Sequence, residues 1–567
     1  MVTGAGVAAA ASVSGCGVNL PLFGQRPLAI DWSSRRASYD HLVIGSGYGG
    51  GIAAARLSAR GETRVAVVER GREWPVGSFP DDSGKAIGAI RIPGVNPLGL
   101  YEIRGQRRIS VLQGCGLGGT SLINGGVAIA PESDVFDAAA WPAGITYETL
   151  RPYFDRARSV LAPTANPRAR SFEKFRAMEK RAAELGLSVD PLDIAVHFGV
   201  DGSNAFGAMQ RGCTDCGDCM TGCNVGAKNT IAMNYLPMAR ANGADIFTGV
   251  EIQWIERLSD GGWRAHGVRY ADWGNTEAIS IDAGAITLSA GALGSTEILL
   301  RSRERGLALS DRLGEGFSGN GDFFAVAYNG DTALNTLGIG DRPFHPWRSR
   351  APGTSVLGGV RYRLPDPGGA RFIVEDLVFP SALLGVLAPV MGLFDGEDTD
   401  TGDEAAEAGR RLLDRPNAPY VADGALNHSL AFIVMGRNDG AGRIALNANG
   451  DAEIDWDADA SRADFFHAID TELREYARAL GARHVSNPVW RLNNRETLIT
   501  AHPLGGCALS DSSDTGVVDE FGRVFDGAGA THAGLYVADG AVIPTALGAN
   551  PLLTISALAE RIVEHIT

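Results

Sequence analysis

The segment 40–69 sets the fold class of this chain. An apolar stretch, 40–44, leads through the glycine-rich turn 45–50 into a helical pattern, and a second apolar stretch, 64–68, ends in Glu69. A strand, a glycine turn, a helix and a second strand in this order form a βαβ unit whose turn meets the phosphates of a dinucleotide. We therefore expect an α/β, Rossmann-like fold with a parallel sheet.

Three glycines of the turn and one acid have separate roles in this unit. Gly45 permits the tight turn, Gly47 lets a pyrophosphate approach the backbone, and Gly50 lets the helix pack closely on the strand. The N-terminus of the helix presents N–H groups to the phosphates. Glu69 follows Gly50 by 19 residues and is placed to accept hydrogen bonds from a ribose diol. An acid at this position argues against a 2′-phosphate on the ribose.

Composition supports a soluble, cofactor-binding protein. The chain has 567 residues, enough for roughly three or four domain-sized units. It contains 75 glycines, about 13% against a usual ~7%, and the excess is typical of tight turns and of backbone that approaches a ligand. Its net charge of −15 excludes a general affinity for nucleic acid.

Residues 1–37 are interpreted as a leader. The stretch 2–15 is small or apolar and uncharged, too short and glycine-rich to span a membrane, and similar to the apolar region of an export signal. Residues Val13–Cys16 resemble a bacterial lipobox, although the first basic residue is Arg26. A start codon placed too late would explain the missing basic region. Two alternatives stay open: export, with a periplasmic or lipid-anchored protein, and an unremarkable leader on a cytoplasmic one.

Several further segments carry a family resemblance. They are Gly114–Gly126, Ser289–Thr296, His502–Gly506, Leu535–Gly540 and Gly548–Pro551. Together they resemble the glucose–methanol–choline (GMC) flavoprotein oxidoreductases, most closely the bacterial cholesterol oxidase branch. The resemblance covers nearly the whole chain from about residue 38, and it implies FAD as the dinucleotide. No histidine occurs in 114–130, where some relatives attach FAD covalently, so we expect non-covalent binding.

The resemblance also implies a domain organisation. A discontinuous FAD-binding domain would be formed by 38–150, 230–310 and 500–567. An α+β substrate-binding domain on an antiparallel sheet would occupy 311–499. Residues 151–229 would be an insertion that carries a cysteine-rich loop.

Matching positions to the family assigns residues to parts of the cofactor. The second glycine segment would lie along the FAD backbone, followed by residues that face the isoalloxazine ring, and the distal segments would hold the ribityl or pyrophosphate oxygens. One residue would lie beside the adenine. The residues along the FAD backbone would be Gly116, Gly118, Gly119 and Thr120, and those facing the ring would be Asn124, Gly125 and Val127. Asp539 and Gly540 would hold the ribityl or pyrophosphate oxygens, Pro551 would also contact the cofactor, and Val250 would lie beside the adenine.

Two polar residues near the C-terminus match the family's catalytic pair. His502 and Asn550 would flank the flavin nitrogen that receives hydride, where the substrate hydroxyl docks. Alcohol oxidation requires loss of a proton from oxygen and of a hydride from carbon, and an imidazole that titrates near neutrality can accept the proton. A neutral amide can orient the hydroxyl and stabilise developing negative charge.

The substrate cavity departs from the cholesterol oxidase pattern. That branch places a glutamate there for isomerisation of a steroid double bond, and the matching stretch here, 426–428, contains no acid. Glu375 and Asp376 are assigned to a different strand. We therefore expect no isomerase activity, and His428 becomes a candidate cavity residue.

Four cysteines lie close together in the insertion. Cys213, Cys216, Cys219 and Cys223 have the C-x2-C-x2-C-x3-C spacing of ferredoxins, which predicts an iron–sulfur cluster with four or three irons. Asn224 stands where a proline usually follows, and no second set of cysteines is present. Zinc on four thiolates and two disulfides are the open alternatives.

An iron–sulfur cluster would change which acceptor receives the electrons of the reduced flavin. A flavin that reacts with oxygen has no use for a relay, so a cluster favours a dehydrogenase that passes electrons to a protein or a quinone. Three alternatives remain: an oxygen-using alcohol or cholesterol oxidase with a zinc or structural cysteine site, a flavin-dependent lyase of the same fold, and a subunit that only relays electrons.

The substrate is inferred from the apolar stretch 377–394. Its 18 residues carry no charge but include two prolines and two glycines, which argues against a spanning helix. An apolar lid or channel wall in peripheral contact with a membrane is one interpretation, and an ordinary core segment is the other. A lid would favour a bulky hydrophobic alcohol, such as a sterol or terpenoid.

Overall fold

The computed structural model describes most of the chain from residue 26 onwards. The described residues are 26–105, 108–271, 275–342, 344–364, 369–393, 396–399, 404–414, 419–437, 442–456, 460–487 and 497–566. Residues 1–25, which include the lipobox-like segment predicted above, lie outside this set.

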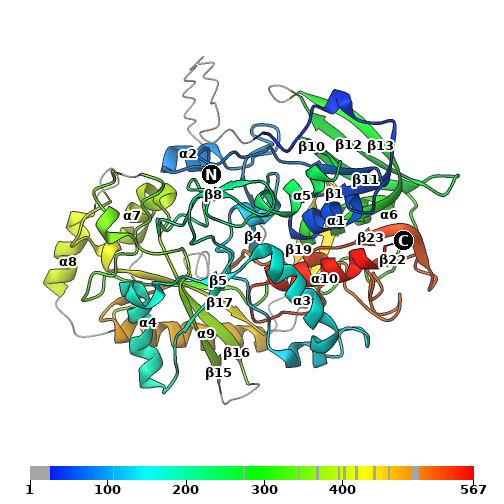
Figure 1. The fold of residues 1–567 in the computed structure, drawn as a ribbon. Coiled ribbons are helices and arrows are strands. Elements are labelled where there is room, and N and C mark those ends of the chain that lie inside the picture. Colours follow the sequence, from blue (N-terminus) through cyan, green and yellow to red (C-terminus); the bar gives the residue numbers. More distant parts are fainter. Residues whose placement is uncertain are drawn as a thin grey trace, which may run out of the picture.

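The largest sheet has eight strands and a parallel centre (Figure 1). The strand order β10-β2-β1-β13 continues to β23 on one path, and each of these neighbouring pairs is parallel. The bounds are β1 Ser38–Ile44, β2 Val65–Glu69, β10 Asp245–Thr248, β13 Thr276–Leu288 and β23 Thr531–Val537. Every residue of β2 is buried, as expected for a parallel strand covered on both faces. The predicted βαβ unit is therefore present at its predicted place.

An antiparallel extension completes this sheet. The long strand β13 also pairs with β12, which pairs with β11, while β22 pairs with β23. Their bounds are β11 Val250–Arg257, β12 Trp263–Tyr270 and β22 Arg523–Phe525.

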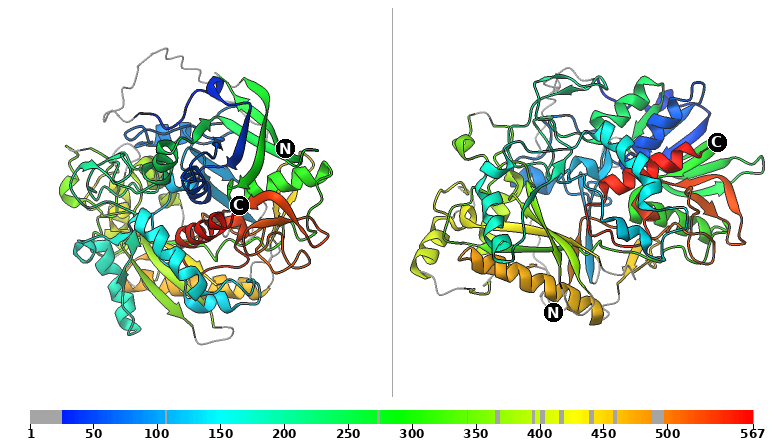
Figure 2. Two further views of the ribbon diagram at one scale, coloured as in Figure 1. Left: turned by 45° about the vertical axis from the view of Figure 1, so that its right-hand side comes forward. Right: turned by 60° about the horizontal axis from the view of Figure 1, so that its bottom comes forward.

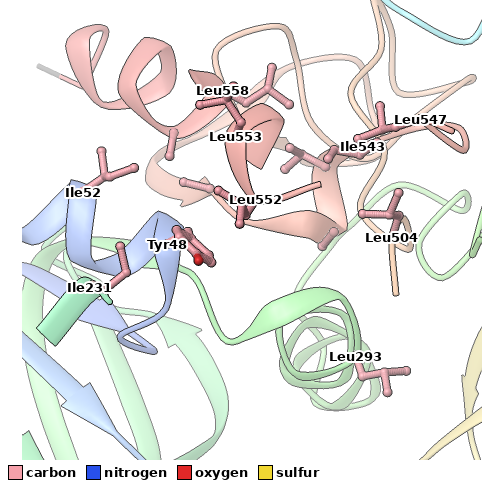
Figure 3. Close-up of a cluster of buried hydrophobic side chains, with 14 of the residues drawn as sticks. Tyr48, Ile52, Ile231, Leu293, Leu504, Ile543, Leu547, Leu552, Leu553 and Leu558 are labelled. Atoms are coloured by element: carbon pink, nitrogen blue, oxygen red, sulfur yellow. The ribbon is translucent and has the colours of Figure 1, made fainter. Parts of the chain in front are cut away.

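Helices cover the sheet and form the main core with it. Helix α1 contacts α5 and α10, and α10 also packs on α3, while α6 packs on β11. The bounds are α1 Tyr48–Ser58, α3 Tyr147–Leu161, α5 Tyr235–Ala241, α6 Gly291–Glu304 and α10 Leu552–Glu564. Figure 3 shows Ile52 of α1 and Leu553 of α10 among the buried apolar side chains, with Tyr48 at the start of α1.

A second, six-stranded sheet forms the other half of the molecule (Figures 1 and 2). Its order is β20-β14-β17-β16-β15-β6 and every pair is antiparallel. The strands are β6 Asp190–Pro191, β14 Phe323–Tyr328, β15 Gly358–Arg363, β16 Arg371–Leu377, β17 Leu430–Gly436 and β20 Arg483–Ser486. Helices α4 (Glu173–Glu184) and α9 (Ala460–Ala479) pack on it. The antiparallel sheet expected in 311–499 is thus observed, with one strand added from the insertion; its role in binding substrate remains a prediction.

A small three-stranded sheet joins the two halves. Strands β3 (Tyr101–Arg104) and β4 (Ile109–Gly114) are antiparallel, and β21 (Leu498–Thr500) runs parallel to β4. Because β4 and β21 end at the same edge, the segments that follow them start side by side. This pairing brings the second glycine segment close to His502.

The remaining α-helices and β-strands lie around these sheets. They are α2 Ser83–Gly88, α7 Leu384–Leu393, α8 Glu404–Leu413, and the short strands β5 Thr164–Ala165, β7 Asp193–Ile194, β8 Gly202–Ser203, β9 Met209–Gln210, β18 Arg443–Leu446 and β19 Ala452–Asp455. Within the described part of the apolar stretch, Leu377 is the last residue of β16, and Leu384–Leu393 form helix α7, which contains Pro389. Within the described residues, the search for a helix of sufficient length and hydropathy to cross a bilayer finds none.

Candidate active site

One large cavity is lined by residues of the half that contains the eight-stranded sheet and of the small three-stranded sheet. Its empty volume is about 1450 Å³, with the open solvent at its mouth included. It extends from the carboxyl end of β1, at the glycine turn, to the start of α10. Fourteen predicted site residues line it: Gly45, Gly47, Glu69, Gly119, Thr120, Asn124, Gly125, Val127, Val250, His502, Asp539, Gly540, Asn550 and Pro551.

The glycine turn has the steric properties that its three glycines predict. Gly45 has a φ of 95°, and a Cβ on it would lie 2.3 Å from the carbonyl oxygen of Ser289. A Cβ on Gly50 would lie 2.0 Å from the carbonyl oxygen of Gly45, so Gly50 serves close packing and does not line the cavity. A Cβ on Gly47 would meet no protein atom within 4 Å. The space over Gly47 belongs to the cavity, which fits a phosphate group approaching the backbone.

Glu69 is buried and holds two turns together. One carboxylate oxygen accepts a hydrogen bond from the Ser46 hydroxyl at 2.6 Å, and the other accepts one from the Gly71 amide at 2.8 Å. Burial raises the pKa of Glu69, whereas these hydrogen bonds lower it. Glu69 lines the cavity, and its contact with a ribose remains a prediction.

The second glycine segment packs directly on the first. The Gly118 amide donates to the Ser46 hydroxyl at 3.0 Å, and a Cβ on Gly119 would lie 2.8 Å from the Cα of Gly47. Gly119 and Thr120 face the cavity, whereas Gly116 and Gly118 do not line it. Gly116 instead lies against the indole of Trp74, where a Cβ would approach to 2.8 Å.

Asn124 presents an unpaired oxygen in the cavity wall. Its side-chain nitrogen donates to the Tyr48 hydroxyl at 2.8 Å, while Oδ1 is buried and has no hydrogen-bond partner among the described residues. A buried polar atom without a partner is costly, so this oxygen indicates a ligand with a matching donor.

Asp539 joins the distal segment to the N-terminus of α6. Its carboxylate accepts hydrogen bonds from the Gly291 amide at 2.8 Å, the Ser295 hydroxyl at 2.5 Å and the Ala541 amide at 2.8 Å. Burial raises its pKa against these hydrogen bonds. Both carboxylate oxygens are occupied by the protein, which makes Asp539 a support for the cavity wall; its expected contact with cofactor oxygens remains a prediction.

His502 is held by a carboxylate that the sequence analysis missed. Its Nδ1 lies 2.8 Å from Oδ1 of Asp322, and Oδ2 of Asp322 accepts hydrogen bonds from the Thr500 hydroxyl at 2.9 Å and the Ala501 amide at 2.8 Å. The side chain of Asp322 is 1% exposed. With Nδ1 bonded to a carboxylate, Nε2 is the nitrogen of His502 that can accept a proton in the cavity.

Asn550 meets an acid that the sequence analysis placed elsewhere. Its Nδ2 donates to Oε2 of Glu375, on β16, at 3.3 Å, while its Oδ1 is buried without a partner among the described residues. Burial raises the pKa of Glu375 to about 8. Glu375 lies in β16, a different strand from β17 that follows 426–428, as expected, and the hydrogen bond nevertheless brings it to Asn550. The expected absence of isomerase activity stays a prediction.

His428 does not line the cavity. It is buried, and its Nδ1 is paired with the carbonyl oxygen of Gly330 at 2.9 Å. Burial lowers its pKa. This placement is that of a packed histidine in the half of the molecule that contains the six-stranded sheet.

The four cysteines line a second, smaller cavity, with an empty volume of about 290 Å³. Cys216 and Cys219 are buried, and Cys213 and Cys223 are half-buried. All four are free thiols. Within the described residues, the structure contains no group of three or more His, Cys, Asp or Glu side chains that could hold a metal ion.

Comparison with known proteins identifies the family. Models of GMC oxidoreductases match residues 1–317 and 393–559. The chain is 28% identical to a cholesterol oxidase of Mycobacterium tuberculosis over 93% of this chain and 90% of that protein, and 24% identical to a long-chain-alcohol oxidase of Arabidopsis thaliana over 94% and 67%. A fungal aryl-alcohol oxidase has the same fold, with a TM-score of 0.60, 17% identity, and coverage of 94% and 99%.

The chain therefore belongs to the GMC oxidoreductase family. Within that family it is an FAD-dependent alcohol oxidoreductase. The site fits the cofactor: the space above Gly47 suits a phosphate, and the unpaired oxygen of Asn124 suits a donor of the ring system. The comparisons give no support for an iron–sulfur cluster.

Proposed function

We propose that this protein oxidises the hydroxyl group of a hydrophobic, sterol- or terpenoid-like alcohol to a carbonyl. The observation that carries the proposal is that His502 and Asn550 line the same cavity as the glycine turn. Relatives named cholesterol oxidase and long-chain-alcohol oxidase support a hydrophobic substrate.

The reaction divides between the two polar residues and the cofactor. Nε2 of His502 accepts the hydroxyl proton, because Asp322 keeps the other ring nitrogen protonated and stabilises the imidazolium that forms. Nδ2 of Asn550 has two hydrogens: one is donated to Glu375, which fixes the amide, and the other is donated to the oxygen of the substrate hydroxyl and orients it. Bound FAD supplies the hydride acceptor.

We propose further that the electrons leave the site through an iron–sulfur cluster on the four cysteines to an external protein or quinone. The meeting of all four thiols at one cavity supports this route. Direct reaction with oxygen, with zinc or uncomplexed thiols at the cysteines, is the competing proposal. Comparing turnover with oxygen and with an artificial one-electron acceptor distinguishes the two.

Substrate entry is assigned to the apolar segment around α7. Leu383 is 38% exposed and Val386 is 41% exposed, so apolar side chains reach the surface there. We propose that this surface makes peripheral contact with a membrane or another apolar phase that holds the alcohol. Binding of the protein to neutral phospholipid vesicles, with a Leu383→Ser/Val386→Ser variant as the comparison, tests the contact.

The experiment that tests the substrate class is a panel of alcohols assayed with an artificial acceptor. A sterol, a terpenoid alcohol and a long-chain alcohol should yield carbonyl products by mass spectrometry, and a sugar or choline should not. A lyase would release an aldehyde from a cyanohydrin without consuming acceptor, and a subunit that only relays electrons would oxidise no alcohol by itself. Either outcome would contradict the proposal.

A further inference from the structure

The cysteine-rich loop has a rigid, built structure. Asp215, Gly217 and Gly222 have positive φ angles of 56°, 85° and 112°, and such conformations are rare and costly for a non-glycine residue. The side chain of Asp215 is buried, accepts a hydrogen bond from Asn166 at 2.6 Å and pairs with Arg168. These contacts fix the conformation of the loop at Asp215.

That conformation directs backbone and thiols toward a common space. The amide of Asp215 points to Sγ of Cys213 at 3.4 Å, a contact typical of thiolates that bind metal centres. On the other side of the loop, Asp218 accepts hydrogen bonds from the backbone and hydroxyl of Ser381. The carbonyl of Gly217 accepts the hydroxyl of Ser355 at 2.7 Å. Contacts from three distant segments thus fix a loop that has no regular secondary structure.

A fully buried cation lies in the wall of this small cavity. Lys228 is 2% exposed, and its ammonium donates to the carbonyl oxygens of Cys219 at 3.0 Å and of Asn124 at 2.5 Å. No carboxylate pairs with it among the ion pairs of the described residues. A buried ammonium without a partner anion is unfavourable, so its position beside four thiols indicates a negatively charged group in the cavity.

The geometry points to a [4Fe–4S] cluster bound by Cys213, Cys216, Cys219 and Cys223, with Lys228 as its counter-charge. A cluster with four thiolates carries net negative charge, which Lys228 offsets. A single zinc ion requires its four ligands about 2.3 Å from one point, whereas a cluster spans a volume and takes its thiolates from the walls around it. All four thiols line one cavity, as a cluster that takes its thiolates from the surrounding walls requires.

Lys228 also connects this cavity to the active site. Its second acceptor, the carbonyl of Asn124, belongs to the segment that lines the large cavity through Asn124 and Gly125. This part of the inference rests on the proposed function. Oxidation of one alcohol releases two electrons and two protons; the cluster passes the electrons singly, and a quinone takes up both electrons and both protons.

The first test is chemical analysis of the whole protein, purified without oxygen. We expect about four iron atoms and about four acid-labile sulfides per chain, and an electron paramagnetic resonance signal after reduction with dithionite. Protein isolated without iron is reconstituted anaerobically with ferrous iron and sulfide and analysed again. One zinc per chain without sulfide, disulfides between the four cysteines, or failure to bind iron on reconstitution would overturn the inference.

A matched pair of variants locates the site. Cys216→Ala should lower the iron content at least tenfold, while Cys507→Ala, a buried cysteine outside the loop, should retain it. Retained flavin content in both variants shows that the chain has folded. Equal iron in both variants would contradict the assignment.

Anaerobic addition of a substrate alcohol separates this inference from the proposed function. Bleaching of the flavin followed by the electron paramagnetic resonance signal of the reduced cluster supports both the proposed function and the electron route. Bleaching without cluster reduction in an iron-loaded protein contradicts the electron route alone. An unbleached flavin in an iron-loaded protein contradicts the proposed function and leaves the cluster assignment supported by the metal analysis.

Discussion

Nδ1 of His502 lies 2.8 Å from the carboxylate of Asp322, and this pairing selects which imidazole nitrogen faces the substrate. Asp322 is itself fixed by Thr500 and by the amide of Ala501, so the ring is held from the end of β21 and from the start of β14 together. A histidine oriented in this way presents one basic nitrogen, Nε2, to a hydroxyl in the cavity.

Asp322→Asn should remove the preference for the His502 tautomer that presents a basic Nε2 to the cavity. The amide can hydrogen-bond either tautomer of His502 and cannot stabilise the imidazolium, so kcat should fall about a hundredfold or more while flavin content stays unchanged. Steady-state kinetics with an artificial acceptor measure the effect. The exposed Asp311→Asn serves as the control, and a kcat for Asp322→Asn within threefold of the unaltered protein would refute the role of this carboxylate.

Gly47→Ala should weaken FAD binding, whereas Gly50→Ala should prevent folding. Gly47→Ala adds a methyl group to the open cavity, so the apoprotein should keep its melting temperature and bind FAD at least tenfold more weakly. Gly50→Ala places a Cβ 2.0 Å from the carbonyl oxygen of Gly45, so little folded protein should form. Flavin titration and thermal melts of the apoproteins check both. Normal FAD affinity in Gly47→Ala would show that no phosphate approaches there.

Glu375 should make stability depend on pH. Burial raises its folded-state pKa to about 8 from an ordinary 4.5, so between these values the folded protein holds a proton that the unfolded chain has lost. The contribution of Glu375 to the free energy of unfolding is therefore fully present below about pH 4.5. It is lost as the pH rises to about 8, by up to about 1.4 kcal/mol per pH unit.

Glu375→Gln should abolish this pH-dependent part of the stability, because glutamine mimics the protonated acid. Urea unfolding between pH 5 and pH 9, over ~4 pH units, should show the variant gaining stability relative to the unaltered protein as the pH rises. The exposed Glu62→Gln should show no such trend. A stability difference that is constant with pH would mean that Glu375 is charged in the folded protein.

Lys174 and Asp376 form a fully buried ion pair whose loss should be costly. Lys174 on α4 lies 2.5 Å from Asp376, next to Glu375 on β16, and also donates to the carbonyls of Thr354 and Ser355. Lys174→Met leaves a buried carboxylate without its cation and should lower the free energy of unfolding by about 3–5 kcal/mol. Lys180→Met, exposed on the same helix, should change it by less than about 0.5 kcal/mol. A cost below 1 kcal/mol for Lys174→Met would show that the charge finds another partner.

Local sequence rules were sufficient for the dinucleotide-binding unit. The turn at Gly45 needs a positive φ, and the apolar strands β1 and β2 are buried on both faces, so both features are visible in a short stretch of chain. His502 and Asn550 were located by family resemblance, and the structure brings both to the cavity.

The supporting residues could not be located in this way. Asp322 precedes β14, and Glu375 lies in β16, a strand whose register is set by pairing with strands far away in the sequence. A side chain on such a strand reaches the active site or points away from it depending on a register shift of one residue. Lys228 is equally hidden, because its two acceptors are backbone carbonyls that no residue type reveals.

Reduction of the flavin by an alcohol in the absence of oxygen tests the central claim most directly. Rapid mixing of the FAD-loaded protein with a sterol or long-chain alcohol should bleach the flavin and yield one carbonyl product per flavin. His502→Ala should slow the bleaching at least a hundredfold, and His532→Gln, at a half-buried histidine that does not line the cavity, should not. Bleaching at an unchanged rate in His502→Ala, or no bleaching by any hydrophobic alcohol, would contradict the account.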